Sequence, residues 1–124
     1  MQGTKMNNFT TSKAWLEAHK LVLVTYRFLR VFPTEEQFSL KNQMQQAAVA
    51  ITTNIAKGYA TESVVDKMQL FMSASMSIIE FHNCLLISRD VGYLKTAYYD
   101  EISRQMMVVN KQIAGLIAAA KKEM

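Results

Sequence analysis

The chain has little of what turns and cross-links require: 124 residues contain one proline, four glycines and one cysteine. An all-β protein needs many turns, so this scarcity disfavours that class and is typical of a helix bundle. A lone Cys84 excludes an internal disulfide framework and a zinc site made of cysteines only. With one thiol and no disulfide to form, a reducing compartment is the simpler expectation.

Long hydrophobic runs are also missing. Residues 1–13, MQGTKMNNFTTSK, are polar and lack the apolar segment of a secretion signal. The longest uninterrupted apolar run is Leu21 to Val24, or Ile113 to Ala120 if Gly115 is counted, whereas a membrane-spanning helix needs about 20 such residues. We therefore expect a cytoplasmic protein with no membrane association.

Apolar residues recur at three- and four-residue steps in four segments, which predicts four helices. Their expected ranges are Ser12 to Val31, Glu35 to Lys57, Ser63 to Val91 and Thr96 to Lys122. Phe32-Pro33 should end the first helix. Thr34 with Gln37 should cap the second, and Gly58 should end it in a left-handed conformation. Gly92 should end the third.

Short connections force successive helices to run antiparallel. We therefore predict an all-α fold, an antiparallel up-down-up-down four-helix bundle formed by residues 10–124, with a flexible tail over residues 1–9. The first and third helices carry two apolar stripes each, one of which is Val65, Met72, Ile79 and Leu86. A helix that is apolar on two sides must bury both, so we expect a subunit interface. The alternative is a core that wraps further round these helices.

Positive charge is concentrated in the first half of the chain. The net charge is +4, and residues 1–60 carry seven basic and three acidic side chains, against seven of each in residues 61–124. Lys13, Lys20 and Arg27 are spaced by seven and share one stripe of a helix. Such a stripe can hold phosphates, although a solvated face is the plainer interpretation. The candidate phosphate contacts are Lys13, Lys20, Arg27, Arg30, Lys41 and Lys57.

No catalytic or metal-binding pattern is evident. Each histidine follows a glutamate by two residues, in Glu17-Ala18-His19 and Glu80-Phe81-His82, a turn of about 200° that points the two side chains apart. We therefore expect no metal, no cofactor and no enzymatic activity, with packing roles for both histidines and Cys84 as a buried thiol. Gln43 and Asn54 are expected as buried amides that set helix register. Tyr93, Tyr98 and Tyr99 form either a cap on the bundle end or a stacking surface for bases.

An ordered set of residues resembles the four-helix-bundle proteins of ribosomal-RNA intervening sequences. It also resembles the accessory variability protein of diversity-generating retroelements. The resemblance covers nearly the whole chain from Phe9. It rests on Trp15, Ala18, Phe32-Pro33, Glu36, Leu40, Gln43, Ala47-Ala48, Ile51, Asn54-Ile55-Ala56, Gly58, Phe71, Ser75, Glu80, Leu85 and Gly92-Tyr93-Leu94. It implies a homopentamer with a basic surface, and for the retroelement member it implies a reverse transcriptase and nucleic acid as partners.

Two departures from that family concern charge. Gln45-Gln46 stands where the family usually has paired arginines, and Lys57 stands where it usually has glutamate. Fewer arginines weaken phosphate binding, while Lys57 restores some positive charge. The expectation is a homo-oligomeric, non-enzymatic module, pentameric by resemblance, that binds RNA or DNA and has a reverse transcriptase as a possible further partner. The alternative is a structural or protein-interaction module with no nucleic-acid role.

Overall fold

Four long helices account for most of the chain, of which the structure, a computed structural model, describes residues 8–36 and 39–124. They are α2 (Lys13–Phe28), α3 (Leu40–Ala60), α4 (Val64–Asp90) and α5 (Thr96–Lys122). Three short 3-10 turns, η1 (Asn8–Thr11), η2 (Leu29–Val31) and η3 (Thr34–Glu36), complete these ranges, in which no strand occurs. The expected tail falls mainly outside the described residues, and its last two positions begin η1.

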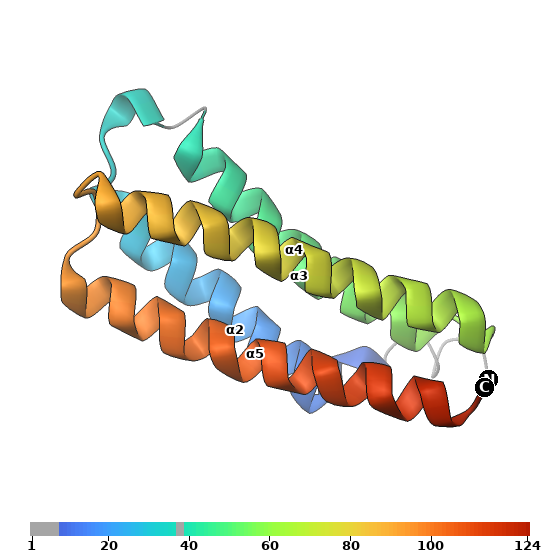
Figure 1. The fold of residues 1–124 in the computed structure, drawn as a ribbon. Coiled ribbons are helices and arrows are strands. Elements are labelled where there is room, and N and C mark those ends of the chain that lie inside the picture. Colours follow the sequence, from blue (N-terminus) through green and yellow to red (C-terminus); the bar gives the residue numbers. More distant parts are fainter. Residues whose placement is uncertain (1–7, 37–38) are drawn as a thin grey trace.

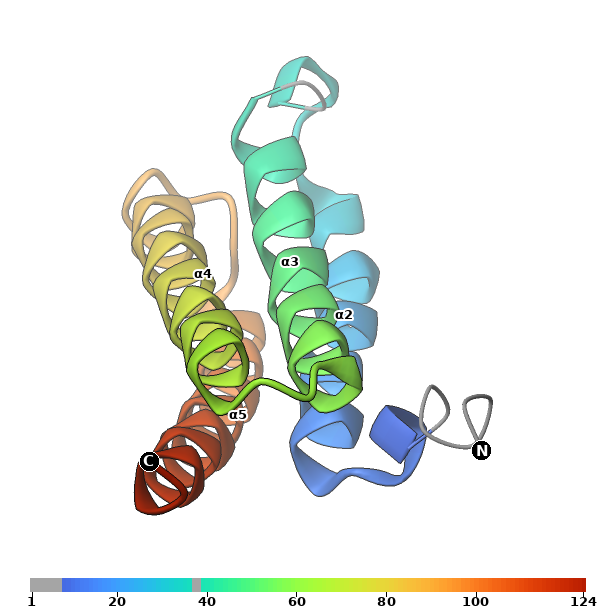
Figure 2. The same cartoon turned by 90° about the vertical axis from the view of Figure 1, so that its right-hand side faces the viewer.

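The helices form the predicted up-down-up-down bundle (Figure 1). Each helix packs against the one that follows it, and α5 returns to pack against α2. Turned by 90°, the bundle shows α3 between α2 and α4, with α5 beside α4 (Figure 2). Because α2 lies between α3 and α5, it borders two helix–helix grooves, and both matter for the candidate site.

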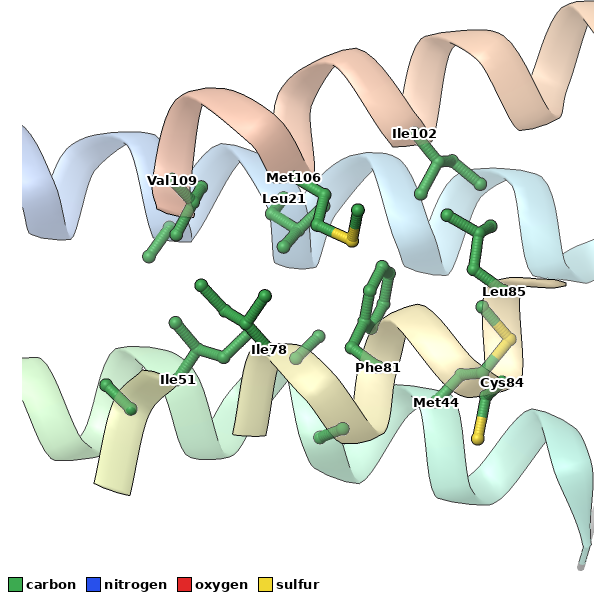
Figure 3. Close-up of a cluster of buried hydrophobic side chains, with 14 of the residues drawn as sticks. Leu21, Met44, Ile51, Ile78, Phe81, Cys84, Leu85, Ile102, Met106 and Val109 are labelled. Carbon is green, nitrogen blue, oxygen red and sulfur yellow. The ribbon is translucent and has the colours of Figure 1, made fainter. Parts of the chain in front are cut away.

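The core runs along the bundle axis and takes side chains from all four helices (Figure 3). Phe81 of α4 is fully buried and points toward α2 and α5. Around it lie other fully buried side chains: Leu21, Met44, Ile51, Ile55, Leu85, Ile102, Val109 and Ile113. Complete burial of a large apolar side chain stabilises a fold by roughly 1.5–3 kcal/mol before the entropic costs, so this seam holds the helices together.

Several helix boundaries follow the predicted chemistry. Ser12 caps α2 by accepting a hydrogen bond from the backbone N of Trp15 at 3.1 Å, and Ser63 caps α4 by accepting one from the backbone N of Asp66 at 3.3 Å. Phe32, before Pro33, is extended with φ −68° and ψ 147°, as a residue before proline should be. Gly92 ends α4 with φ 84°, a left-handed conformation that glycine adopts without steric cost.

The predicted start of the second helix was wrong. Residues 34–36 form the separate turn η3, and α3 begins at Leu40 after Ser39. The capping partner Gln37 lies outside the described residues. The side chains that pack on the core begin only at Leu40 and Met44. Thr34 and Glu35 are exposed, so they contribute no burial to a longer helix, and burial is what stabilises most protein helices.

Gly58 does not end α3, contrary to the sequence-based expectation. It is buried inside the helix, which continues to Ala60, and its φ is not positive. The reason for glycine here is space. A Cβ at this position would lie 2.8 Å from Cδ1 and 2.9 Å from Cζ of Phe71, closer than van der Waals contact allows. Gly58 therefore lets the Phe71 ring of α4 approach the backbone of α3.

The sequence predicts two apolar stripes on α2 and leaves open which of them faces the core. Leu21, Thr25 and Phe28 are buried, whereas Tyr26 is exposed. Both sides of this helix are apolar, so periodicity could not select the inward one. The buried side of α2 is the one that fits against α3 and α5.

Two glycine substitutions should change stability in opposite directions. Gly58→Ala should destabilise the protein, because overpacking of about 1–3 kcal/mol outweighs a gain in helix propensity of about 1 kcal/mol. Gly115→Ala should stabilise it by about 0.5–1 kcal/mol, since Gly115 lies within α5 and a Cβ added there would meet nothing within 4 Å. Denaturant unfolding measures both, and a stabilising Gly58→Ala would contradict the packing explanation.

Candidate nucleic-acid interface

The structure separates the six predicted phosphate contacts into three groups. Lys20 and Arg27 of α2 line a groove between α2 and α5, where Arg104 of α5 joins them. Lys57 lines a second groove, between α2 and α3. The others line neither groove: Lys13 and Arg30 are exposed and Lys41 is half-buried.

The groove between α2 and α5, called here the α2–α5 groove, has a volume of about 560 Å³. Arg27 and Arg104 provide a guanidinium from each side, and neither forms an ion pair within the described part of the chain. Arg27 also lies over the Phe28 ring, with its Cζ 5.0 Å from the ring centroid, which holds the side chain near the groove. The full lining is Lys20, Leu23, Val24, Arg27, Glu101, Arg104, Gln105 and Val108.

Two acids interrupt this positive groove. Glu101 lines it directly. Glu17, four residues after Lys13 on α2, pairs with the Lys20 ammonium at 3.2 Å. Gln105 of α5 donates a hydrogen bond to the Glu17 carboxylate at 3.0 Å and another to its backbone oxygen at 2.8 Å. The Gln105 hydrogen bond is the main reason why the pKa of Glu17 lies below its usual value, with a further contribution from Lys20.

The groove between α2 and α3, called here the α2–α3 groove, has a volume of about 470 Å³, and four of its nine lining residues carry amides. Gln45, Gln46 and Lys57, the positions at which the chain departs from the related family, all lie here. Asn54 lines this groove half-buried, and Gln43 is exposed with its amide oxygen 3.8 Å from the Cys84 thiol. The expectation that Gln43 and Asn54 are both buried was therefore wrong. The complete lining is Tyr26, Asn42, Gln45, Gln46, Val49, Ala50, Thr53, Asn54 and Lys57.

The tyrosine cluster closes one end of the bundle. Tyr98 stacks on Phe28 with ring centroids 4.4 Å apart, and Tyr93 packs against Phe32 at 5.3 Å. The Arg89 guanidinium lies over Tyr99, 5.1 Å from its centroid. These rings are engaged within the chain, which favours the bundle-end cap over a surface for stacking bases.

A third surface, the α4 face, is apolar and points outward. It consists of Val65, Met72, Met76 and Ile79, and the last two are 65% and 61% exposed. Seven- and four-residue spacing places them on one stripe of α4. By length and composition alone, α4 is the one helix in the described ranges that could cross a membrane, and a core helix of a bundle meets the same test.

The histidines and the cysteine of the described ranges lie in separate surroundings. Within residues 8–36 and 39–124, no three His, Cys, Asp or Glu side chains gather where they could hold a metal ion. His19 stacks on Trp15 with centroids 4.7 Å apart, and His82 is exposed. Burial raises the pKa of the Cys84 thiol, which disfavours the reactive thiolate.

Arg104 and Gln105 were missed by the sequence analysis. The prediction compared net charge between the two halves of the chain. Because basic and acidic residues balance in the second half, that comparison gave no reason to select Arg104. The signal that could have found it is topological. In an up-down-up-down bundle the first and last helices are neighbours, so a basic residue beside the core positions Ile102 and Met106 borders the first helix.

Comparisons with known proteins support this fold. The family model described as 23S rRNA-intervening sequence protein matches residues 10–115. A solved structure of a protein of unknown function from the S23 ribosomal protein family of Bacteroides thetaiotaomicron VPI-5482 is similar, with a TM-score of 0.77 and 15% sequence identity. The match covers 84% of this chain and 97% of that chain, and at this identity it shows the fold alone. No curated protein matches the chain.

The Glu17–Gln105 contact generates a pH prediction. Gln105→Met should raise the pKa of Glu17 toward its ordinary value, because the hydrogen bond that favours the carboxylate is lost. A folded-state pKa below the unfolded value stabilises the protein above the unfolded pKa, and this contribution disappears as pH falls through the folded pKa. Carboxyl NMR titration measures the shift, and an unchanged Glu17 pKa in the variant would contradict this role of Gln105.

Proposed function

This chain belongs to the family of 23S rRNA-intervening sequence proteins, and on that premise we propose that it is a non-enzymatic, homo-oligomeric module that binds the phosphate backbone of RNA or DNA. The observation that carries the proposal is the α2–α5 groove. It places Arg27 and Arg104, both without a carboxylate partner among the described residues, on opposite sides of one hollow.

Arginine suits this role because its planar guanidinium binds phosphate oxygens through two parallel hydrogen bonds. The lining also includes Leu23, Val24 and Val108, which would offer sugars an apolar surface without reading base edges. Phosphate contacts position a nucleic acid but carry no sequence information. Lys13, Arg30, Lys41 and Lys57 would add phosphate contacts outside the groove.

Assembly strengthens this argument. The α4 face leaves Val65, Met72, Met76 and Ile79 exposed, and a contiguous apolar patch on a surface marks an interaction site. A second copy of the chain is the proposed occupant, and the resemblance supplies the number five. A chain with a net charge of +4 is a weak ligand for a polyanion, whereas several linked copies can contact phosphates simultaneously.

A second candidate function is protein interaction without nucleic acid. It is favoured by Glu17 and Glu101, which interrupt the positive groove, and by the α4 face if another protein covers it. The resemblance to the retroelement accessory protein names a reverse transcriptase as a partner of this kind. Binding and mass measurements on charge variants separate the two functions.

The first experiment reverses charge in the groove. Lys20→Glu/Arg27→Glu should weaken binding of labelled RNA and DNA by at least about tenfold, because phosphate contacts are replaced by repulsion. Binding by the unaltered protein should fall steeply between about 50 and 200 mM salt, and the variant should show a shallower salt slope. Fluorescence anisotropy measures both quantities.

The matched control is Lys121→Glu/Lys122→Glu, which makes the same charge change at the C-terminal end of α5. It should retain most of the binding, since it leaves the groove intact. Equal losses of binding in the two variants would show that net charge, and not the groove, determines the affinity. No binding by the unaltered protein at low salt would favour the protein-interaction function.

The second experiment concerns assembly. Light scattering coupled to size exclusion, at micromolar concentration, should give about five times the chain mass of 14.1 kDa. Met72→Glu/Ile79→Glu should shift the mass toward a single chain while the helical circular dichroism signal remains, because charges buried in an apolar contact are costly.

Met107→Glu is the control, since Met107 is 59% exposed on α5 and lies outside the α4 face. It should leave the mass unchanged. A monomeric unaltered protein would refute assembly, whereas a tetramer or hexamer would refute only the number five. An intact oligomer in the double variant would refute the α4 face as its interface.

A further inference from the structure

Glu101 is the one acidic residue in the lining of the α2–α5 groove. It is exposed, and its carboxylate has no hydrogen bond or ion pair among residues 8–36 and 39–124. Glu17 beside the groove differs, since Lys20 and Gln105 both bind its carboxylate. A negative charge repels phosphate, so a groove that bound only phosphate would gain affinity from a neutral residue at position 101.

Two contacts between α2 and α5 define where Glu101 lies along the groove. Gln105 donates to the Glu17 carboxylate at 3.0 Å, and Tyr98 stacks on Phe28 with ring centroids 4.4 Å apart. Glu101 lies between Tyr98 and Gln105 on α5. Because the two helices are antiparallel, Glu101 lies across from the middle of the α2 segment that runs from Glu17 to Phe28.

The charges along the groove follow a definite order. The lining residues recur at three- and four-residue steps, which places them on one face of each helix: Lys20, Leu23, Val24 and Arg27 on α2, and Glu101, Arg104, Gln105 and Val108 on α5. Arg104 follows Glu101 by one turn, about 5–6 Å between Cβ atoms, toward Lys20. Arg27 lies in the opposite direction, about 10.5 Å beyond Lys20 along α2. Positive charge therefore lies on both sides of a central carboxylate.

The backbone of a nucleic-acid strand has the same order, because each sugar lies between two phosphates. A carboxylate can only accept hydrogen bonds. The phosphate oxygens of the backbone are also acceptors, whereas the 2′-hydroxyl of ribose is a donor that DNA lacks. Dinucleotide-binding proteins use an acidic side chain in this way to bind a ribose hydroxyl. Glu101 therefore has a backbone donor to bind in RNA and none in DNA.

We propose that the α2–α5 groove selects RNA over DNA, because Glu101 accepts a hydrogen bond from a ribose 2′-hydroxyl while the two flanking phosphates contact Arg104 and Arg27. Leu23 and Val24, between Lys20 and Arg27 on α2, contact the carbon atoms of the same sugar. This inference rests on the proposed function and names its ligand: the arginines supply affinity for phosphate, and Glu101 distinguishes the sugar.

The test uses the full chain and three labelled single strands of uracil nucleotides that differ only in the 2′ substituent, which is hydroxyl, fluorine or hydrogen. Fluorine keeps the sugar conformation of RNA but donates no hydrogen bond. Fluorescence anisotropy at low salt should show the hydroxyl strand bound at least about fivefold more tightly than the other two, as expected for one hydrogen bond to a charged group at an exposed site. All three strands carry the same base, so a contact between Glu101 and a base cannot produce the difference.

Three variants separate the acceptor from the charge. Glu101→Met removes both, so it should bind the three strands about equally and should bind the fluorinated and deoxy strands more tightly than the unaltered protein does. Glu101→Gln removes the charge but keeps an acceptor oxygen, so it should retain part of the preference for the hydroxyl strand. The control Glu123→Gln makes the same change at the C-terminal end of α5, outside the groove, and should preserve the full preference.

A direct readout is the NMR signal of the Glu101 carboxyl carbon, which should shift clearly more with the hydroxyl strand than with the fluorinated one. Equal binding of these two strands by the unaltered protein, or a preference that persists in Glu101→Met, would overturn the role of Glu101 and leave phosphate binding standing. Binding of none of the strands would overturn the proposed function and this inference together. Displacement of the hydroxyl strand by millimolar uridine monophosphate would assign the groove to a free ribonucleotide and overturn the RNA strand as its ligand.

Discussion

The structure depends on one constraint: α4 is apolar around much of its surface, and a four-helix bundle can bury only one side of it. Phe71, Ile78, Phe81 and Leu85 take the buried side, and the last three belong to the main core cluster. Gly58 allows the closest approach, because a side chain there would collide with the Phe71 ring. The opposite side, the α4 face, is left exposed. The filled core and the exposed apolar face are thus two consequences of the same excess of apolar residues.

The position of α2 in the bundle, rather than the net charge of the chain, determines which basic side chains lie together. The helix lies between α3 and α5, so its two sides open onto grooves of different chemistry. The α2–α5 groove is lined by two guanidiniums that have no ion pair among the described residues, and by the apolar side chains of Leu23, Val24 and Val108. The lining of the α2–α3 groove includes four amides, Lys57 and Tyr26. Glu17 pairs with Lys20 of the first groove.

Prediction from sequence succeeded where local chemistry decides the outcome. The range of α5 matched, Phe32 before Pro33 is extended, and Gly92 adopts the left-handed conformation that its position requires. It failed where contacts with residues far away in the sequence determine the outcome. Gly58 looked like a helix end because no local pattern reveals the Phe71 ring. Periodicity could not show that Tyr26 is exposed, because both sides of α2 are apolar. Arg104 was overlooked because charge was counted along the chain.

The sequence by itself determined the number of helices, their order and the antiparallel topology, since these follow from periodicity, capping residues and short connections. Only the tertiary structure decided which side of α2 and α4 is buried, and which basic residues share a groove. Side-chain periodicity defines stripes on a helix, but the stripe that faces inward is chosen by fit against neighbouring helices. For that reason Lys20 and Arg27 meet Arg104, while Lys13, Arg30 and Lys41 remain outside the groove.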